Sequence, residues 1–493
     1  MSEEEEEEVK SVHPNGMILE VDENPKKVSS WIVLAIQHVL AMFVACVTVP
    51  LLVFSGTNVV IDGVTTNLSS LMLAPTLFSA GIGTLFYLFV TKFKSPVFLA
   101  SSFAYIAAMS EAIKIDAGEG QVNLWILPFG MLMVGLVYCL VALLIKIFKV
   151  DWLNKLLPPI VVGPVIMVIG LSLAGSAISN MTKTSGSGQP YNWCAIISGL
   201  VALVVTALCS HYGKKTLNLI PFVIGMLAGY VVACLFTFIS MGISNPDVKA
   251  YFQVIDFSPL VNLFKKVSVQ SFIDYPKFLF LVAAQSSGSV VPLSGSAVGQ
   301  ACLIFIPVSL VTICEHIGDH KNLSGILQRD LLEEPGLTRT LIGDGVATAL
   351  SGICCGAANT TYGENVAVVG VTKIASTKVI ALACVFSILL GFIAPVMAFT
   401  ETIPGCVTGG VSLILYGFIA SSGVKMLMNE KIDMGKTKNI FIASTILVAG
   451  IGGLAFSFGT GSAKVSITAV SVSMILGILM NAILREKKEA TAE

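Results

Sequence analysis

The chain has 493 residues, of which 55% are hydrophobic and 12% are charged, and its net charge is -1. Its mean hydropathy is +0.86. A soluble protein of this size cannot bury so much apolar surface, because accessible surface still grows steeply with mass, whereas a lipid bilayer accepts it. The sequence has no basic cluster, so a nucleic-acid partner is not expected.

The first 29 residues are polar and include six consecutive glutamates, Glu3–Glu8. Such a run cannot bury apolar surface, so residues 1–29 are predicted to form a disordered acidic tail. No cleavable signal peptide is visible. We therefore expect the first apolar segment, from Trp31, to serve as the membrane-insertion signal.

Fourteen apolar segments follow, and a helix that spans a bilayer needs about 20 such residues. Long segments begin near residues 30, 70, 125, 157, 192, 216, 298, 377, 403, 437 and 463, and shorter or interrupted ones lie at about 96–110, 339–354 and 363–375. The sequence therefore predicts an all-α polytopic membrane protein with 14 transmembrane segments. Segments 3 and 10 are expected to contain short extended pieces.

The basic residues are distributed unevenly between the two sides of this topology. With both termini in the cytoplasm, 22 of the 29 Lys and Arg residues lie inside, and four of the other seven fall in one long loop, 242–297. Cytoplasmic loops are enriched in Lys and Arg, and long loops follow this rule less closely. The pattern predicts a multi-pass protein of the plasma membrane with cytoplasmic termini.

Seven segments precede the loop 242–297 and seven follow it. The stretch that begins at Pro158 resembles the stretch that begins at Pro404, which pairs segment 5 with segment 12. Because each half has an odd number of segments, the halves are predicted to be inverted repeats, an arrangement typical of transporters. Broken helices at membrane depth occur where they line a cavity, so segments 3 and 10 are expected to line a central cavity.

Ionisable and polar side chains inside the apolar segments are candidates for function, since a charge at the bilayer centre costs roughly 2.5–3.5 kcal/mol on insertion scales. They are Gln37, His38, Glu315, His316, Asp319, Asp344, Glu364 and Asn365. Glu315 and Asp319 are four residues apart and share one face of a helix, whereas His316 points elsewhere. A buried carboxyl can exchange a proton near neutral pH, as proton-coupled transport requires. The alternative for a single group such as His38 is a buried hydrogen bond that locks two helices.

Other chemistries find no support in the sequence. The sequence contains no recognisable phosphate-binding loop, metal-ligand spacing or nucleophile–base set. We therefore expect no ATP-driven transport, no cofactor or metal, and no enzymatic catalysis. The eleven cysteines are expected to be small buried side chains.

Several motifs, dispersed from Trp31 to Leu484, resemble in order those of the nucleobase–ascorbate transporter family, and most closely its bacterial uracil permeases. They are QHVLAMF at 37–43, ASSFA at 100–104, CEHIGDH at 314–320, NTTYGEN at 359–365 and the stretch 404–423. The resemblance implies a homodimer whose core domains move like elevators against gate domains. The implied division is a core domain of segments 1–4 and 8–11 (30–150 and 298–400), a gate domain of segments 5–7 and 12–14 (151–241 and 401–484), an extracellular loop (242–297) and a cytoplasmic tail (485–493).

The resemblance also implies a set of site residues. Those expected to bind the substrate are Glu315, Glu364, Phe103, Ala45 and Gly363, and those expected in the proton-coupling network are His38, Asp319 and Asn365. The expected partners are a nucleobase such as uracil, a proton and membrane lipid.

Two positions depart from the family pattern. A third position differs between family members that transport different substrates. Asp319 stands where several uracil permeases have His, and Ala367 stands at a glycine position. Glu364 replaces the glutamine that is usual in xanthine and urate members. Proton-coupled uracil uptake is therefore expected, and a xanthine or purine symporter on the same scaffold stays open. An anion transporter is disfavoured because Glu315 and Glu364 repel an anion.

Overall fold

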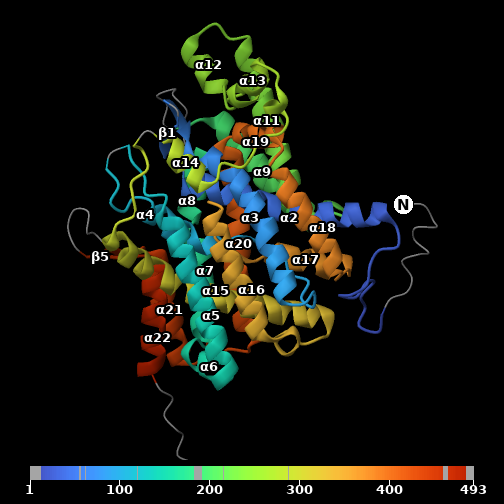
Figure 1. Cartoon of the computed structure of the whole chain (residues 1–493), viewed down its shortest axis with the longest axis vertical. Coiled ribbons are helices and arrows are strands. Elements are labelled where there is room, and N and C mark those ends of the chain that lie inside the picture. The colour runs from blue at the N-terminus through green and yellow to red at the C-terminus, as the bar shows by residue number, and fades with distance from the viewer. Residues whose placement is uncertain are drawn as a thin grey trace, which may run out of the picture.

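The computed structural model describes residues 13–54, 57–61, 63–118, 120–182, 191–214, 216–286, 288–458 and 465–484. Glu3–Glu8 and the predicted tail 485–493 lie outside these residues. Within them the chain is a mostly helical polytopic membrane protein (Figure 1).

Eight helical stretches in the described part are long and apolar enough to cross a membrane. They are α2 (Val28–Val53), α3 (Leu68–Val90), α5 (Ile126–Phe148), α7 with α8 (Pro159–Ser172 and Ala174–Thr182), α9 (Trp193–Tyr212), α11 (Pro221–Met241), α15 (Gly295–Leu327) and α20 (Gly405–Asn429). Three shorter apolar helices are α18 (Thr377–Leu390), α21 (Thr437–Ile451) and α22 (Ala469–Ile483).

The remaining helices are shorter or less apolar. They are α4 (Ile106–Ala112), α6 (Asp151–Leu156), α10 (Thr216–Leu219), α12 (Pro246–Phe252), α13 (Ser258–Lys265), α14 (Leu279–Gln285), α16 (Leu337–Ile353), α17 (Gly363–Thr372) and α19 (Ala394–Thr402), with single turns at η1 (Phe103–Tyr105), η2 (Val269–Ser271) and η3 (Leu332–Gly336). The helices α12 and α13, from the loop 242–297, project at one end of the molecule, and α6 and α22 lie at the other (Figure 1).

Close packing between helices depends on glycines that let two backbones approach. A Cβ atom added to Gly135 of α5 comes 2.7 Å from the carbonyl oxygen of Gly345 on α16. Likewise, a Cβ added to Gly170 of α7 comes 2.3 Å from the carbonyl oxygen of Tyr416 on α20. These distances are too short for a side chain, so the two pairs α5–α16 and α7–α20 require glycine at these positions.

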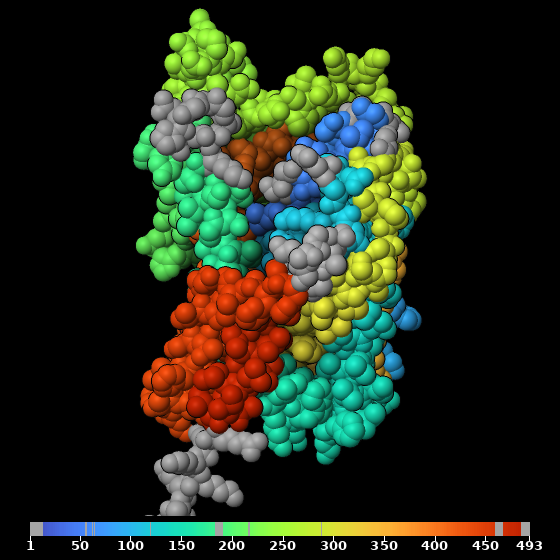
Figure 2. Space-filling model, turned by 90° about the vertical axis from the view of Figure 1, so that its left-hand side faces the viewer, coloured from blue at the N-terminus to red at the C-terminus, as the bar shows by residue number. Residues whose placement is uncertain are grey.

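Three two-stranded antiparallel sheets complete the fold. They are β1 (Asn58–Ile61) with β2 (Val64–Asn67), β3 (Leu99–Ser101) with β4 (Asn359–Thr361), and β5 (Phe456–Phe458) with β6 (Val465–Ile467). Figure 2 shows one face of the molecule hollowed between the green segment that includes α9 and the cyan segment that includes α4.

The pair β3–β4 is buried and joins the two halves of the chain. Its register sets Leu99 against Thr361 and Ser101 against Asn359. Because a strand in the membrane cannot leave backbone groups unpaired, threonines on neighbouring helices supply further partners. Thr84 Oγ1 on α3 accepts from Leu99 N at 2.9 Å, and Thr348 Oγ1 on α16 donates to Asn359 O at 2.8 Å.

One part of the chain differs from the expectation for the acidic tail 1–29. Residues 13–27 are packed against the rest of the protein, and Met17 and Val21 are 0% and 3% exposed. The predicted disorder is wrong for these residues, because the glutamate run ends at Glu8 and the apolar side chains that follow supply surface to bury.

Candidate functional site

Three carboxyl groups come together where α15 meets the start of α17. Glu315 and Asp319 lie on successive turns of α15, and Glu364 lies in the first turn of α17. Thr361, three residues before Glu364, is hydrogen-bonded to Asp319, which lies one helical turn from Glu315. Glu315 and Glu364 are both partly exposed. The structure thus places the two predicted substrate-binding carboxylates within electrostatic reach of each other.

The strand β4 fixes the start of α17 beside α15. Thr361 Oγ1, at the end of β4, donates a hydrogen bond of 2.6 Å to Asp319 Oδ2. Gly363 follows two residues later, and a Cβ atom added there has Asp319 Oδ1 as its nearest neighbour, at 3.8 Å. Gly363 is exposed, so its backbone borders accessible space next to Glu364.

Phe103 and Ala45 come from two other elements. Phe103 begins η1 directly after β3, is 7% exposed, and meets the ring of Tyr416 on α20 edge to face at 5.8 Å. Ala45 is 1% exposed on α2. Its neighbour Cys46 holds its Sγ 3.5 Å from Ser101 Oγ in β3. Ala45 is therefore beside the strand pair.

His38 and Asn365 form a separate contact between α2 and α17. Asn365 Nδ2 lies 3.1 Å from the carbonyl oxygen of His38 and 3.2 Å from its Nδ1. Both residues are buried. Since Asn365 directly follows Glu364, this buried contact between two helices helps to hold the start of α17.

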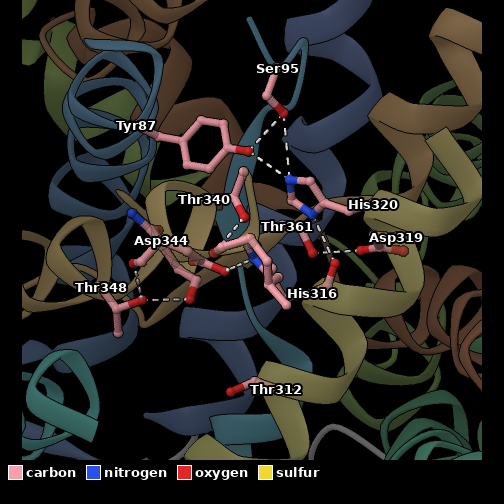
Figure 3. A network of polar contacts seen from close by, with 12 residues as sticks. Tyr87, Ser95, Thr312, His316, Asp319, His320, Thr340, Asp344, Thr348 and Thr361 are labelled. Atoms are coloured by element: carbon pink, nitrogen blue, oxygen red, sulfur yellow. Dashed lines mark hydrogen bonds and ion pairs between the residues drawn. The ribbon is translucent and has the colours of Figure 1, made fainter. Parts of the chain in front are cut away.

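A buried polar network lies beside Asp319 on a neighbouring face of α15 (Figure 3). His316 Nδ1 is 2.7 Å from Asp344 Oδ2 of α16, and both side chains are fully buried. The ring of His320 stacks on that of His316, with centroids 4.1 Å apart. His320 Nε2 is 2.7 Å from the hydroxyl of Tyr87 on α3, which in turn is 2.8 Å from Ser95 Oγ.

The network also contains His320, Tyr87 and Ser95, which the sequence does not predict for the site. The signals available were the spacing of His316 and His320, four residues apart on one helix face, and a carboxylate, Asp344, in an apolar segment. Within the described residues, His316 Nε2 and Asp344 Oδ1 have no hydrogen-bond partner. The helix α15 thus carries carboxylates towards accessible space on one face and a fully buried His–Asp pair on another.

The functional groups at the site are carboxyls, which bind a ligand through hydrogen bonds. Across the described residues, no group of three or more His, Cys, Asp or Glu side chains is placed to hold a metal ion. An ionised carboxylate only accepts hydrogen bonds, and a protonated one can also donate. Carboxyls of both kinds suit an uncharged ligand that has N–H donors and carbonyl acceptors.

Comparison with known proteins gives a consistent set of relatives. The model of a permease family matches residues 29–458. The chain is 37% identical to the uracil permease of Bacillus caldolyticus over 97% of this chain and 96% of the relative. It is 35% identical to the uracil permease of Bacillus subtilis (strain 168), with 94% of each covered. It is 33% identical to that of Escherichia coli (strain K12), with 93% and 94% covered.

Solved structures resemble this one in fold at low sequence identity. The murine anion transporter Slc26a9 in its inward-facing state has a TM-score of 0.60 at 11% identity, covering 94% of this chain and 69% of the other. The transmembrane domain of the cyanobacterial bicarbonate transporter BicA has a TM-score of 0.53 at 11% identity, covering 93% and 98%. At this identity the likeness describes the fold alone.

Proposed function

The chain belongs to the permease family of nucleobase–ascorbate transporters, whose model matches residues 29–458, and from this premise we propose that it takes up uracil together with protons. It is a membrane transporter and not an enzyme, as the family and the uracil permeases are. The observation that carries the proposal is the hydrogen bond from Thr361 to Asp319, which brings the start of α17, with Glu364, beside the part of α15 that holds Glu315.

Uracil matches the chemistry of these groups. It is a flat, uncharged ring with two N–H donors and two carbonyl acceptors, so an ionised Glu364 accepts from an N–H and a protonated Glu315 donates to a carbonyl. Phe103, Ala45 and Gly363 shape the pocket around the ring. A site built to pair these groups rejects a base with a different edge, because its own polar groups would then stay unpaired.

The crowding of the three carboxyl groups supports proton coupling. Glu315, Asp319 and Glu364 repel one another when all are ionised, so a proton enters the site together with the neutral ring. His38 and Asn365 belong to the same coupling network, because their contact holds the start of the helix that carries Glu364.

The transport cycle uses two inverted repeats of seven segments. Residues 30–150 and 298–400 form the moving core domain, and residues 151–241 and 401–484 form the gate domain of a homodimer. The third segment of each half supports this repeat, because β3 leads into η1 and α4 as β4 leads into α17. The loop 242–297 is extracellular and both termini are cytoplasmic, as the distribution of Lys and Arg favours.

Uptake of labelled uracil by cells that lack their own uracil permease tests this proposal. We expect accumulation that excess unlabelled xanthine leaves unchanged and that slows as the external pH is raised. No accumulation, or a strong block by xanthine, contradicts the substrate. A requirement for sodium, with no response to pH, contradicts proton coupling.

A further inference from the structure

The residues before α2 make a set of contacts that the transport site does not explain. Residues 13–24, here called the N-terminal strap, lie beside α17 and the end of α15 (Figure 1, right). These two helices carry Glu364 and Glu315. The strap therefore contacts both helices of the site, away from the site itself.

On the α15 side, the strap binds the end of the helix. Asn15 Nδ2 donates a hydrogen bond of 3.0 Å to the carbonyl oxygen of Leu327, the last residue of α15. The last carbonyls of a helix have no partner within the helix, so Asn15 supplies one that the helix lacks. Leu327 is 12 residues beyond Glu315, or about 18 Å along the helix.

On the α17 side, the strap runs parallel to the segment that joins α17 to α18. Ile18 N donates to the carbonyl oxygen of Lys373 at 2.7 Å, and Ala375 N donates to that of Leu19 at 2.9 Å. Both the N–H and the hydroxyl of Thr377 donate to the carbonyl oxygen of Val21, at 3.1 and 2.9 Å. Lys373, with φ of 58°, is the left-handed residue that ends α17.

Apolar burial and internal bonds hold the strap in this shape. Met17 is 0% and Val21 is 3% exposed, so both side chains belong to the protein core. His13 Nε2 lies 2.8 Å from Glu23 Oε2, which also accepts from Glu20 N at 2.8 Å. These contacts close the strap on itself while its backbone stays bonded to the α17–α18 connection.

We propose that the N-terminal strap positions α17 against α15, so that Glu364 keeps its place opposite Glu315. The helix α17 has only 10 residues, and a helix this short is marginal without tertiary contacts. Its first residues are held by Thr361 and by the contact between Asn365 and His38, and its last residues by the strap. The part of this inference that concerns transport rests on the proposed function.

The test compares full-length Val21→Asp with Val28→Asp, the same change at a residue that is 75% exposed. Hydrogen–deuterium exchange of peptides covering residues 363–377 measures how stably α17 is folded, and this measurement needs no substrate. Uracil uptake per transporter at the membrane gives KM and Vmax. Only Val21→Asp is expected to speed exchange and to raise KM, each at least about tenfold, because small displacements of a binding group weaken binding strongly.

Any other outcome contradicts either the restraint of α17 by the strap or the effect of the strap on the site. Unchanged exchange in Val21→Asp, or equal exchange in Val28→Asp, refutes the strap as a restraint on α17. Faster exchange with unchanged KM refutes its positioning role. If the unsubstituted protein takes up no uracil, the proposed function fails, and exchange still decides whether the strap restrains α17. Should Val21→Asp not fold, Asn15→Ala removes the side-chain bonds of Asn15 to Leu327, Glu20 and Met17 and must show the same two effects in weaker form.

Discussion

Thr361 Oγ1 donates a hydrogen bond of 2.6 Å to Asp319 Oδ2 and so joins β4 to α15 at the edge of the carboxyl cluster. A hydrogen bond to a carboxylate orients it and satisfies one of its oxygens where water has little access. Since Thr361 pairs with Leu99 of β3, the orientation of Asp319 depends on both halves of the chain.

The first prediction concerns Thr361→Val, which keeps the shape of the side chain and removes its hydroxyl. We expect a loss of about 1 kcal/mol in the free energy of unfolding and slower uracil uptake, because Asp319 loses its orienting donor. Thermal unfolding and initial uptake rates measure the two effects. Thr361→Ser, which keeps the hydroxyl, is the control and should behave like the unsubstituted chain. Equal uptake by the Val and Ser variants would contradict the prediction.

The second prediction concerns the two carboxylates that meet across α15 and α17. We expect Glu364→Gln and Glu315→Ala each to abolish high-affinity uracil uptake while the protein still reaches the membrane. The first replaces the charged acceptor of a ring N–H with a neutral amide, and the second removes the donor to a ring carbonyl. Glu111→Gln removes a carboxylate whose side chain is 48% exposed and should leave uptake unchanged. Normal uptake by either site variant removes that residue from the substrate site.

The helices that carry this site could be predicted from the sequence because their signals are local. The expected segments 339–354 and 363–375 correspond to α16, Leu337–Ile353, and α17, Gly363–Thr372. Apolar runs interrupted by polar residues locate such helices without knowledge of their neighbours. The family resemblance based on these motifs is confirmed by the family model over residues 29–458.

The contacts that the sequence did not predict all join residues far apart in the chain. Helical spacing places His316 and His320 on one face, but it does not say that Asp344 of α16 faces them. Thr361 lies within a recognised motif, yet its role depends on how β4 approaches α15. The strap was missed because the glutamate run dominates the composition of the N-terminus, whereas Met17 and Val21 find their partners only in the folded protein.

The third prediction concerns the buried pair of His316 and Asp344, whose facing atoms are 2.7 Å apart. Removing one partner of a buried ionisable pair typically costs about 3–5 kcal/mol, because the other stays buried without its partner. We expect Asp344→Ala to lower the free energy of unfolding by this amount and Asp344→Asn, which can still hydrogen bond, to lower it less. Thermal unfolding of the purified protein measures both, and an Asp344→Ala variant as stable as the unsubstituted chain contradicts the pairing.

A fourth relationship lies at the surface, outside the membrane-spanning segments. The carboxylate of Glu334 pairs with Lys94 Nζ and, at 3.0 Å, with Arg329. The hydrogen bond from Lys94, followed by the positive charges of Lys94 and Arg329, lowers the pKa of Glu334 below its ordinary value of 4.5. A carboxyl whose pKa falls on folding contributes stability above the unfolded-state pKa and loses it as the pH falls through the folded-state pKa.

Glu334→Gln should therefore cost stability near neutral pH and cost little in acid. We expect its thermal unfolding midpoint to lie below that of the unsubstituted chain at about pH 6 and the gap to close as the pH falls below the folded-state pKa of Glu334, where the native carboxyl is protonated as well. Glu333→Gln removes the same charge from the neighbouring exposed position and should show no such gap, because Glu333 lacks these two partners. A gap that persists in acid, or one of equal size in Glu333→Gln, means that the pairing of Glu334 with Lys94 and Arg329 does not stabilise this surface.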